Sequence, residues 1–182
     1  MSSEENTSPR EKIIATAAPL FYREGYRAVG IDKIIAQSGV AKATFYKHFP
    51  SKDDLMVAWV ERAGAQSKSM FEAAIGDTPL FDYVDRVLTI AATTTCYGCT
   101  FQGTASEFPS PSHPAHAASI KVKTDVIATL QHLAARQGIA NPEHCGEIVF
   151  LLLEGVWASV RMFGAKAPLG QIKAAVRKLV AQ

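Results

Sequence analysis

Long apolar runs are missing from this chain. The longest covers residues 148–153 and ends at the acidic Glu154, whereas a membrane-spanning helix needs about 20 apolar residues. The first ten residues, MSSEENTSPR, are polar and acidic, unlike the basic and apolar start of a signal peptide. We therefore expect a cytoplasmic protein with no membrane partner.

Cysteine is scarce, with three residues in a chain of 182. So few thiols build no disulfide framework, which fits a reducing compartment. Cys96 and Cys99 have the C-x-x-C spacing, at which two thiols can pack in a core, sense oxidants or share a metal. Because no second ligand pair has a recognised spacing, we predict no metal site.

Enzyme motifs are also absent from the sequence. It has no glycine-rich phosphate loop, no G-x-S-x-G elbow and no paired-carboxylate pattern,. We therefore predict no enzymatic activity and no cofactor. The alternative from another class is a small redox protein or oxidant sensor that uses Cys96 and Cys99.

Strand-like alternation of apolar and polar residues does not occur, and helical periodicity dominates the chain,. The sequence therefore predicts an all-α fold. Ser51 and Asp54 have the spacing of a capping box at the start of a long helix. The expected helices cover residues 9–24, 31–38, 42–49, 52 onward, 79–96, 100–108, 115–136, 142–163 and 168–180.

Net positive charge is confined to the first quarter of the chain. Residues 9–52 contain eight Lys and Arg against three Asp and Glu, whereas residues 53–182 contain eleven against twelve. This asymmetry favours a polyanionic partner for the first quarter alone.

Two short helices in this quarter, residues 31–38 and 42–49, are joined by a tight turn at Gly39 and have the proportions of a helix-turn-helix. We expect Ala43, Phe45 and Phe49 to pack inward. The remaining positions carry hydrogen-bond donors suited to phosphates and base edges in a major groove. The expected DNA-binding side chains are Lys42, Thr44, Tyr46, Lys47, His48 and, in the next helix, Lys52.

Residues 10–59 resemble the DNA-binding domain of the tetracycline-repressor (TetR) family. The resemblance rests on I-I-x-x-A-x-x-L-F-x-x-x-G-Y at residues 13–26 and IDKIIAQSGVAKATFYKHFPSKDDL at residues 31–55. It implies an N-terminal three-helix DNA-binding domain, followed by a larger helical domain that binds a ligand and dimerises. Val29 and Gly30 stand where many relatives have hydroxyl residues that contact phosphate, so this contact either falls to a backbone N–H or is absent.

The resemblance further implies a homodimeric repressor that leaves a palindromic operator when an unknown small-molecule effector binds. A module that kept the fold but lost its operator is a further alternative. We expect a tail at residues 1–8, the DNA-binding domain at residues 9–51 and the effector-binding and dimerisation domain at residues 52–182.

Aromatic and acidic residues of the larger domain suit an effector site, although core packing would use the same aromatic residues. The expected effector-binding residues are Phe71, Tyr83, Tyr97, Phe101, Glu107, Phe108, Glu154 and Trp157. The helix at residues 142–163 is apolar nearly all round, which favours burial against a second copy. The expected dimer interface contains Leu152, Gly155, Ser159, Met162, Ile172 and Val176.

Overall fold

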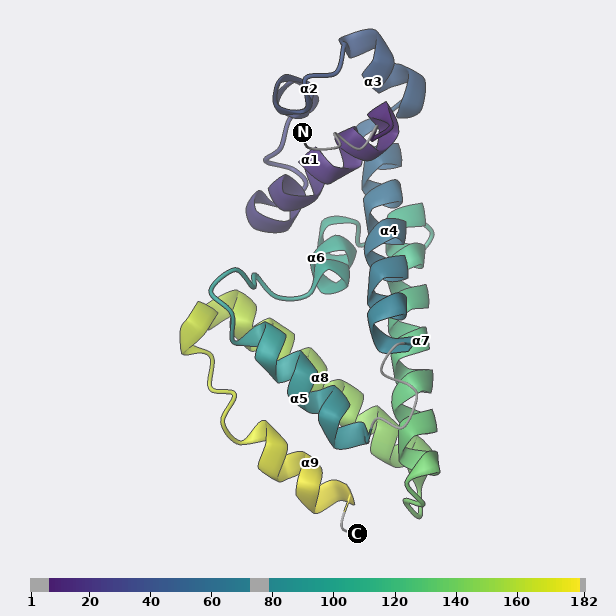
Figure 1. Ribbon diagram of the computed structural model, residues 1–182, viewed down its shortest axis with the longest axis vertical. Helices are drawn as coiled ribbons and strands as arrows, with labels where there is room; N and C mark the ends of the chain where they lie inside the picture. The colour runs from purple at the N-terminus through teal and green to yellow at the C-terminus, as the bar shows by residue number, and fades with distance from the viewer. Residues whose placement is uncertain (1–6, 73–78, 181–182) are drawn as a thin grey trace, which may run out of the picture. The chain divides into compact units, whose positions relative to one another are not determined.

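The computed structural model describes residues 7–72 and 79–180, with all side chains in these ranges except those of residues 70–72. The predicted effector residue Phe71 therefore lies outside the described side chains. Over these ranges the chain forms nine α-helices and one 3₁₀ helix, with no strand, so the all-α prediction is confirmed. Figure 1 labels the α-helices.

The helices follow one another with short connections. They are α1 (Pro9–Glu24), α2 (Ile31–Ser38), α3 (Lys42–His48), α4 (Lys52–Glu72), α5 (Leu80–Ala91), α6 (Thr100–Glu107), α7 (Pro114–Arg136), α8 (Pro142–Phe163), η1 (Gly164–Lys166) and α9 (Ile172–Val180).

Local capping explains where several helices begin and end. The Asp54 carboxylate accepts from the Ser51 backbone N–H at 2.9 Å, and the Ser51 hydroxyl accepts from the Asp54 N–H at 3.1 Å, so the capping box is confirmed,. Asn141 caps α8 by accepting from the His144 N–H at 3.2 Å. Gly39 ends α2 with φ of 66°, a left-handed conformation that favours glycine,.

Two predicted boundaries were wrong. Helix α5 ends at Ala91 and does not continue to Cys96. The Thr93 hydroxyl donates to the Ile90 carbonyl at 2.8 Å, and such side-chain bonds compete with helical ones,. Helix α9 begins at Ile172 and not at Pro168, because the Leu169 N–H bonds to the Ala167 carbonyl in a tight turn.

The chain divides into two compact units. The first unit contains the described residues of Met1–Ala63 together with Gln102–Ser119, and the second contains those of Gly64–Phe101 and Ile120–Gln182. Helices α4, α6 and α7 thus each contribute residues to both units. The predicted domain boundary between residues 51 and 52 stays a prediction.

The first unit is built around α1, whose buried stripe contacts α2 and α3. Figure 1 shows α1, α2 and α3 gathered at the N-terminal end of α4. The stripe consists of Ile13, Ile14, Ala17, Leu20 and Phe21. Their spacing of three and four residues places them on one face of the helix.

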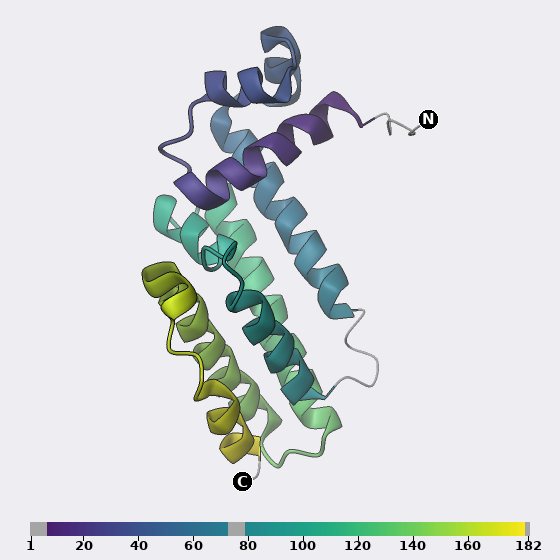
Figure 2. The same cartoon turned by 60° about the vertical axis from the view of Figure 1, so that its left-hand side comes forward.

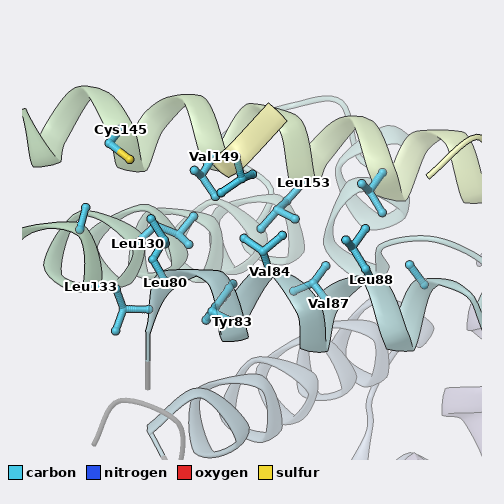
Figure 3. Packing of buried hydrophobic residues seen from close by; sticks show 14 of the residues in the cluster. Leu80, Tyr83, Val84, Val87, Leu88, Leu130, Leu133, Cys145, Val149 and Leu153 are labelled. Atoms are coloured by element: carbon cyan, nitrogen blue, oxygen red, sulfur yellow. The ribbon is translucent and has the colours of Figure 1, made fainter. Parts of the chain in front are cut away.

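The second unit is a helical bundle in which α8 contacts α5 and α9. In Figures 1 and 2, α5 and α8 run side by side. Figure 3 shows Val149 and Leu153 of α8 directed toward Val84 of α5 and Leu130 of α7. All four are nearly or fully buried, so this apolar contact forms the core of the second unit.

Helix α8 has an unusual amount of apolar surface. Among the described residues, the segment Pro142–Lys166 is long and apolar enough to cross a membrane by length and composition. Core helices of soluble proteins pass the same test, and α8 buries Cys145, Val149, Leu153, Val156 and Val160 in the bundle.

Gly146 gives a sharp test of how closely α7 and α8 approach. A Cβ atom added there would lie 2.7 Å from the backbone nitrogen and 2.9 Å from the Cα of Gln131. Because a backbone cannot yield locally, we expect Gly146→Ala to lower the free energy of unfolding by about 1–3 kcal/mol. Urea denaturation of the variant and the wild-type protein would measure this difference in the free energy of unfolding.

Gly170→Ala is the matched control, since nothing lies within 4 Å of an added Cβ atom there. It should change the free energy of unfolding by about 0.5 kcal/mol or less. Equal stability of the two variants would contradict the close approach of α7 and α8.

Candidate nucleic-acid interface

Helix α3 is held in the first unit by two aromatic residues. Phe45 is fully buried and Phe49 is 2% exposed. Their rings lie 6.1 Å apart, and the Arg10 guanidinium lies 5.4 Å from the Phe49 centroid. These contacts fix the rotation of α3 about its axis, and with it the face that α3 presents to solvent.

The predicted DNA-binding side chains lie along the solvent-accessible part of α3. Lys42, Tyr46 and Lys47 are exposed, and Thr44 and His48 are half-buried. Lys42 lies 3.7 Å from Asp32, but this ion pair is exposed and therefore weak,. The structure thus brings these five donors together on one short helix.

Gly30 precedes α2 as its N-cap residue and makes no side-chain capping bond. The first backbone N–H groups of a helix have no partner within the helix, and the helix dipole favours an anion there. The start of α2 can therefore offer backbone donors to a phosphate, as the sequence predicts for Gly30.

Ala43 corrects one expectation, because its side chain is exposed and not packed inward. It lies in the first turn of α3, between Lys42 and Thr44. An exposed methyl group at this end of the helix can contact the methyl group of a thymine. Sequence reasoning missed this position because alanine fits a core face equally well.

Lys52 has a further role that the sequence did not reveal. Its ammonium donates to the carbonyls of Tyr26 at 2.8 Å and Val29 at 3.0 Å. It also lies 4.0 Å from the centroid of the Tyr26 ring. Burial lowers the pKa of Lys52. Lys52 thus ties the turn between α1 and α2 to the start of α4, and one N–H remains for the predicted phosphate contact.

Asp53, next to Lys52, joins two further side chains. Its carboxylate accepts a hydrogen bond from the Tyr26 hydroxyl, and its Oδ2 lies 3.4 Å from His113 Nε2. Burial, and then the hydrogen bond to Asp53, raise the pKa of Tyr26, so the phenol stays protonated at neutral pH,.

His113 has a defined tautomer. The Ala115 N–H donates to His113 Nδ1 at 3.2 Å. Because Nδ1 accepts, the proton of the neutral ring is on Nε2, from which it can be donated to Asp53. The segment before α7 is thereby attached to the start of α4.

The end of α6 contacts the same part of the first unit. Glu107 Oε2 lies 3.2 Å from Arg27 Nε, and the Phe108 ring lies 4.7 Å from that of Tyr26 and 4.1 Å from that of His113. We call the connection formed by residues 107–113 the α6–α7 connector. Glu107 and Phe108, predicted to bind an effector, are engaged here with the α1–α2 turn.

The other predicted effector residues belong to the second unit. Tyr83 is 2% exposed in its core, and burial raises the pKa of its hydroxyl. Tyr97 is exposed, Phe101 is buried and Trp157 is half-buried. Glu154 forms an ion pair with Lys123 of α7, a partner that the sequence did not predict.

The predicted dimer residues divide into two sets. Gly155 and Met162 are exposed, and Leu152, Ser159 and Ile172 are half-buried. Val176 corrects an expectation, since it is fully buried among the core residues of the second unit. A side chain covered in this way cannot contact a second copy. Leu151 and Phe163, which the prediction did not include, are also exposed.

The cysteines favour the packing interpretation. Cys96, Cys99 and Cys145 are buried and take part in no disulfide among the described residues, and burial raises the pKa of Cys145. Buried apolar surroundings make a thiol less reactive. No group of described residues has the composition of a metal site.

The fold and the surface of α3 define a class of proteins, the helix-turn-helix DNA-binding regulators. Residues 13–59 match the family model described as "Bacterial regulatory proteins, tetR family". The chain is 33% identical over 70 residues to the uncharacterised HTH-type transcriptional regulator YxaF of Bacillus subtilis. That match covers 38% of this chain and 37% of YxaF. The first curated relatives are thus matched over less than two-fifths of their length.

Two further relatives illustrate a likeness that extends over nearly the whole chain or all of it. A TetR-family transcriptional regulator from Streptomyces coelicolor has a similar crystal structure, with a TM-score of 0.84 and 29% identity over 95% of this chain and 94% of that one. The HTH-type transcriptional repressor NemR of Escherichia coli is 25% identical over all of this chain and 98% of its own length. The comparisons support a transcriptional regulator of the TetR family, whose DNA-binding domain matches residues 13–59, and they do not favour the redox alternative.

The role of Lys52 can be separated from that of the exposed lysines by stability. We expect Lys52→Met to lower the free energy of unfolding by about 1.5 kcal/mol or more, because two carbonyls lose a charged donor. Lys47→Met, on the exposed face of α3, should change it by about 0.5 kcal/mol or less. Thermal unfolding followed by circular dichroism would measure both. A Lys52→Met variant as stable as Lys47→Met would show that the hydrogen bonds of Lys52 to the two carbonyls do not stabilise the first unit.

Proposed function

We propose that the protein is a homodimeric, ligand-released repressor that binds a palindromic operator in double-stranded DNA of the cytoplasm. The observation that carries the proposal is the surface of α3. The buried Phe45 and Phe49 hold this helix in place, and five donor side chains lie on its accessible part. The proposal assigns no enzymatic activity to the chain.

The surface divides by chemistry into two kinds of contact. Lys42 and Lys47 are exposed ammonium groups that suit phosphate oxygens. Thr44 and Ala43 lie in the first turns of α3, where a recognition helix meets base edges,. In this arrangement the lysines supply affinity, and the small residues supply the sequence preference.

The proposed dimer is supported by the exposed face of α8. Leu151 is 65% exposed, Met162 is 76% exposed and Phe163 is 54% exposed, which is high for large apolar side chains. Gly155 lies between them in sequence and is exposed as well, with open space around it. A second copy of this face is the self-complementary partner that a two-fold dimer requires.

Ligand release is supported by the way the chain is shared between units. Helix α6 starts in the second unit, and its C-terminal end, with the α6–α7 connector, belongs to the first. A ligand that shifts α6 would therefore act on Arg27 and Tyr26 through Glu107 and Phe108. Each tenfold loss of operator affinity requires a difference of about 1.4 kcal/mol in ligand binding between the two states.

The first test of this function is Lys47→Ala. Operator fragments would be selected from genomic DNA, and the dependence of affinity on salt would be measured by fluorescence anisotropy. We expect weaker binding to every selected fragment and a salt slope reduced by about one unit for each bound protomer.

Lys178→Ala, an exposed change on α9, is the control and should leave the slope unchanged. An unchanged slope for Lys47→Ala would remove α3 from the interface. If no fragment is selected by the wild-type protein, the alternative of a module without an operator would be correct.

The second test is Gly155→Arg. An added Cβ atom at Gly155 meets nothing within 4 Å of its own protomer, so the variant should fold. The charged side chain would be buried by a facing copy of α8, at a cost that splits the dimer. Sedimentation should show a monomer. Because a dimer is needed to contact two half-sites about 34–36 Å apart, operator affinity should fall together with dimerisation.

Ala128→Arg, exposed on α7, is the matched control and should remain dimeric. A wild-type protein that sediments as a monomer yet protects a palindromic site would contradict the proposed assembly.

A further inference from the structure

Asp32 is an exposed acidic side chain in the most basic part of the chain. Residues 9–52 contain three acidic residues. Two of them, Glu11 and Glu24, form close ion pairs of 2.9 Å and 2.7 Å with a basic side chain. Asp32 differs from both, because its side chain is 91% exposed. Among the described residues its one ion pair is the 3.7 Å contact with Lys42.

The contact with Lys42 places the carboxylate beside the proposed DNA-binding surface. Asp32 lies in the first turn of α2, and Lys42 is the first residue of α3. The carboxylate therefore lies near the N-terminal end of α3, from which a recognition helix reaches base edges. An exposed ion pair of this length contributes little to folding. Lys42, whose side chain is 67% exposed, can exchange the carboxylate for a phosphate at small cost.

A carboxylate in this position opposes DNA binding unless it meets a hydrogen-bond donor. Phosphates repel it, and it loses its cation when Lys42 turns to a phosphate. The helix dipole favours an acidic residue at the start of α2,, but the dipole does not remove the repulsion from DNA. Specificity arises when a group penalises the wrong partner and is satisfied by the right one. Asp32 has this property toward DNA if a base edge supplies the donor.

The chemistry of the bases selects the donor. In the major groove, guanine and the polar edge of thymine present acceptors, which repel a carboxylate. Adenine presents its N6 amino group next to N7, which is a further acceptor. Cytosine presents the N4 amino group alone, and Asp and Glu side chains accept from it. Cytosine is therefore the base that suits Asp32.

We propose that Asp32 is a specificity-determining residue that accepts a hydrogen bond from the N4 amino group of a cytosine. A two-fold dimer presents Asp32 twice, so one such cytosine lies in each half-site of the operator. At other sequences the carboxylate meets acceptors and phosphates, which lowers affinity. This inference rests on the proposed function, because it requires the surface of α3 to bind double-stranded DNA.

The first experiment compares base preferences. The wild-type protein and Asp32→Ala would each select binding sites from a random duplex library, and the selected duplexes would be sequenced. We expect one position in each half-site at which the wild-type protein prefers cytosine and Asp32→Ala shows no preference. Preferences at the other positions should agree. Identical preferences throughout, or a change confined to positions without cytosine, would overturn the proposal.

The second experiment measures the coupling between Asp32 and the cytosine by fluorescence anisotropy. One duplex carries the selected operator, and the other has T·A in place of C·G at the cytosine of both half-sites. The wild-type protein should bind the altered duplex about tenfold more weakly or worse, since each base contact contributes to discrimination. Asp32→Ala should distinguish the two duplexes by about twofold or less, as a double-mutant cycle requires of interacting groups.

Glu24→Gln is the matched control, because it removes the same charge from the first unit and releases Lys33. It should raise affinity for both duplexes by the same factor and keep the discrimination between them. If Asp32→Ala behaves in the same way, Asp32 acts through its charge alone and the proposal is wrong. Circular dichroism of each variant checks that it is folded, which we expect from the exposure of Asp32.

The inference and the proposed function can fail separately. A wild-type protein that selects an operator, together with an Asp32→Ala variant that keeps every base preference, would reject the role of Asp32 and leave the regulator in place. A uniform loss of affinity in Asp32→Ala would make Asp32 a positioning residue for Lys42 and would also reject this role. If the wild-type protein selects no duplex, both proposals fail.

Discussion

The apolar contact of α8 with α5 and α7 is the interaction on which the second unit depends. Val149, Leu153 and Leu130 are buried there, and α9 adds Val176 to the same core. This contact uses only one face of α8, while Leu151 and Met162 stay exposed on the other. A helix that is apolar on two faces is typically buried on both, and the exposed face is the one that we propose as the dimer contact. The same surplus of apolar surface also explains why α8 resembles a membrane span by composition alone.

The first unit relies on polar attachment where its helices are short. Helices α2 and α3 have eight and seven residues, too few to be stable alone,. Phe45 and Phe49 anchor α3, and Lys52 holds the α1–α2 turn through two carbonyls. Asp53 then links Tyr26 to His113. The α6–α7 connector is therefore part of the unit that carries the DNA-binding surface.

Much of this architecture was predictable because its signals are local. The Ser51–Asp54 capping box and the glycine after α2 are each read within four residues, and both occur as predicted. Contacts between residues that are far apart in the sequence were not predictable in this way. Lys123 and Glu154 are 31 residues apart, and Lys123 has no local feature that separates it from the exposed Lys121. Likewise, the burial of Val176 depends on which face of α9 packs against the other helices of the second unit. Periodicity defines such faces but does not assign their partners.

The anchoring of α3 has a consequence for how such proteins diverge. Its two buried phenylalanines carry the packing, whereas Lys42, Ala43, Tyr46 and Lys47 are exposed. Substitutions at exposed positions usually change stability by about 0.5 kcal/mol or less. Selection can therefore alter the chemistry of this face step by step without passing through unfolded intermediates. A duplicated gene could acquire a new operator preference through a few such changes while the helical scaffold is inherited intact.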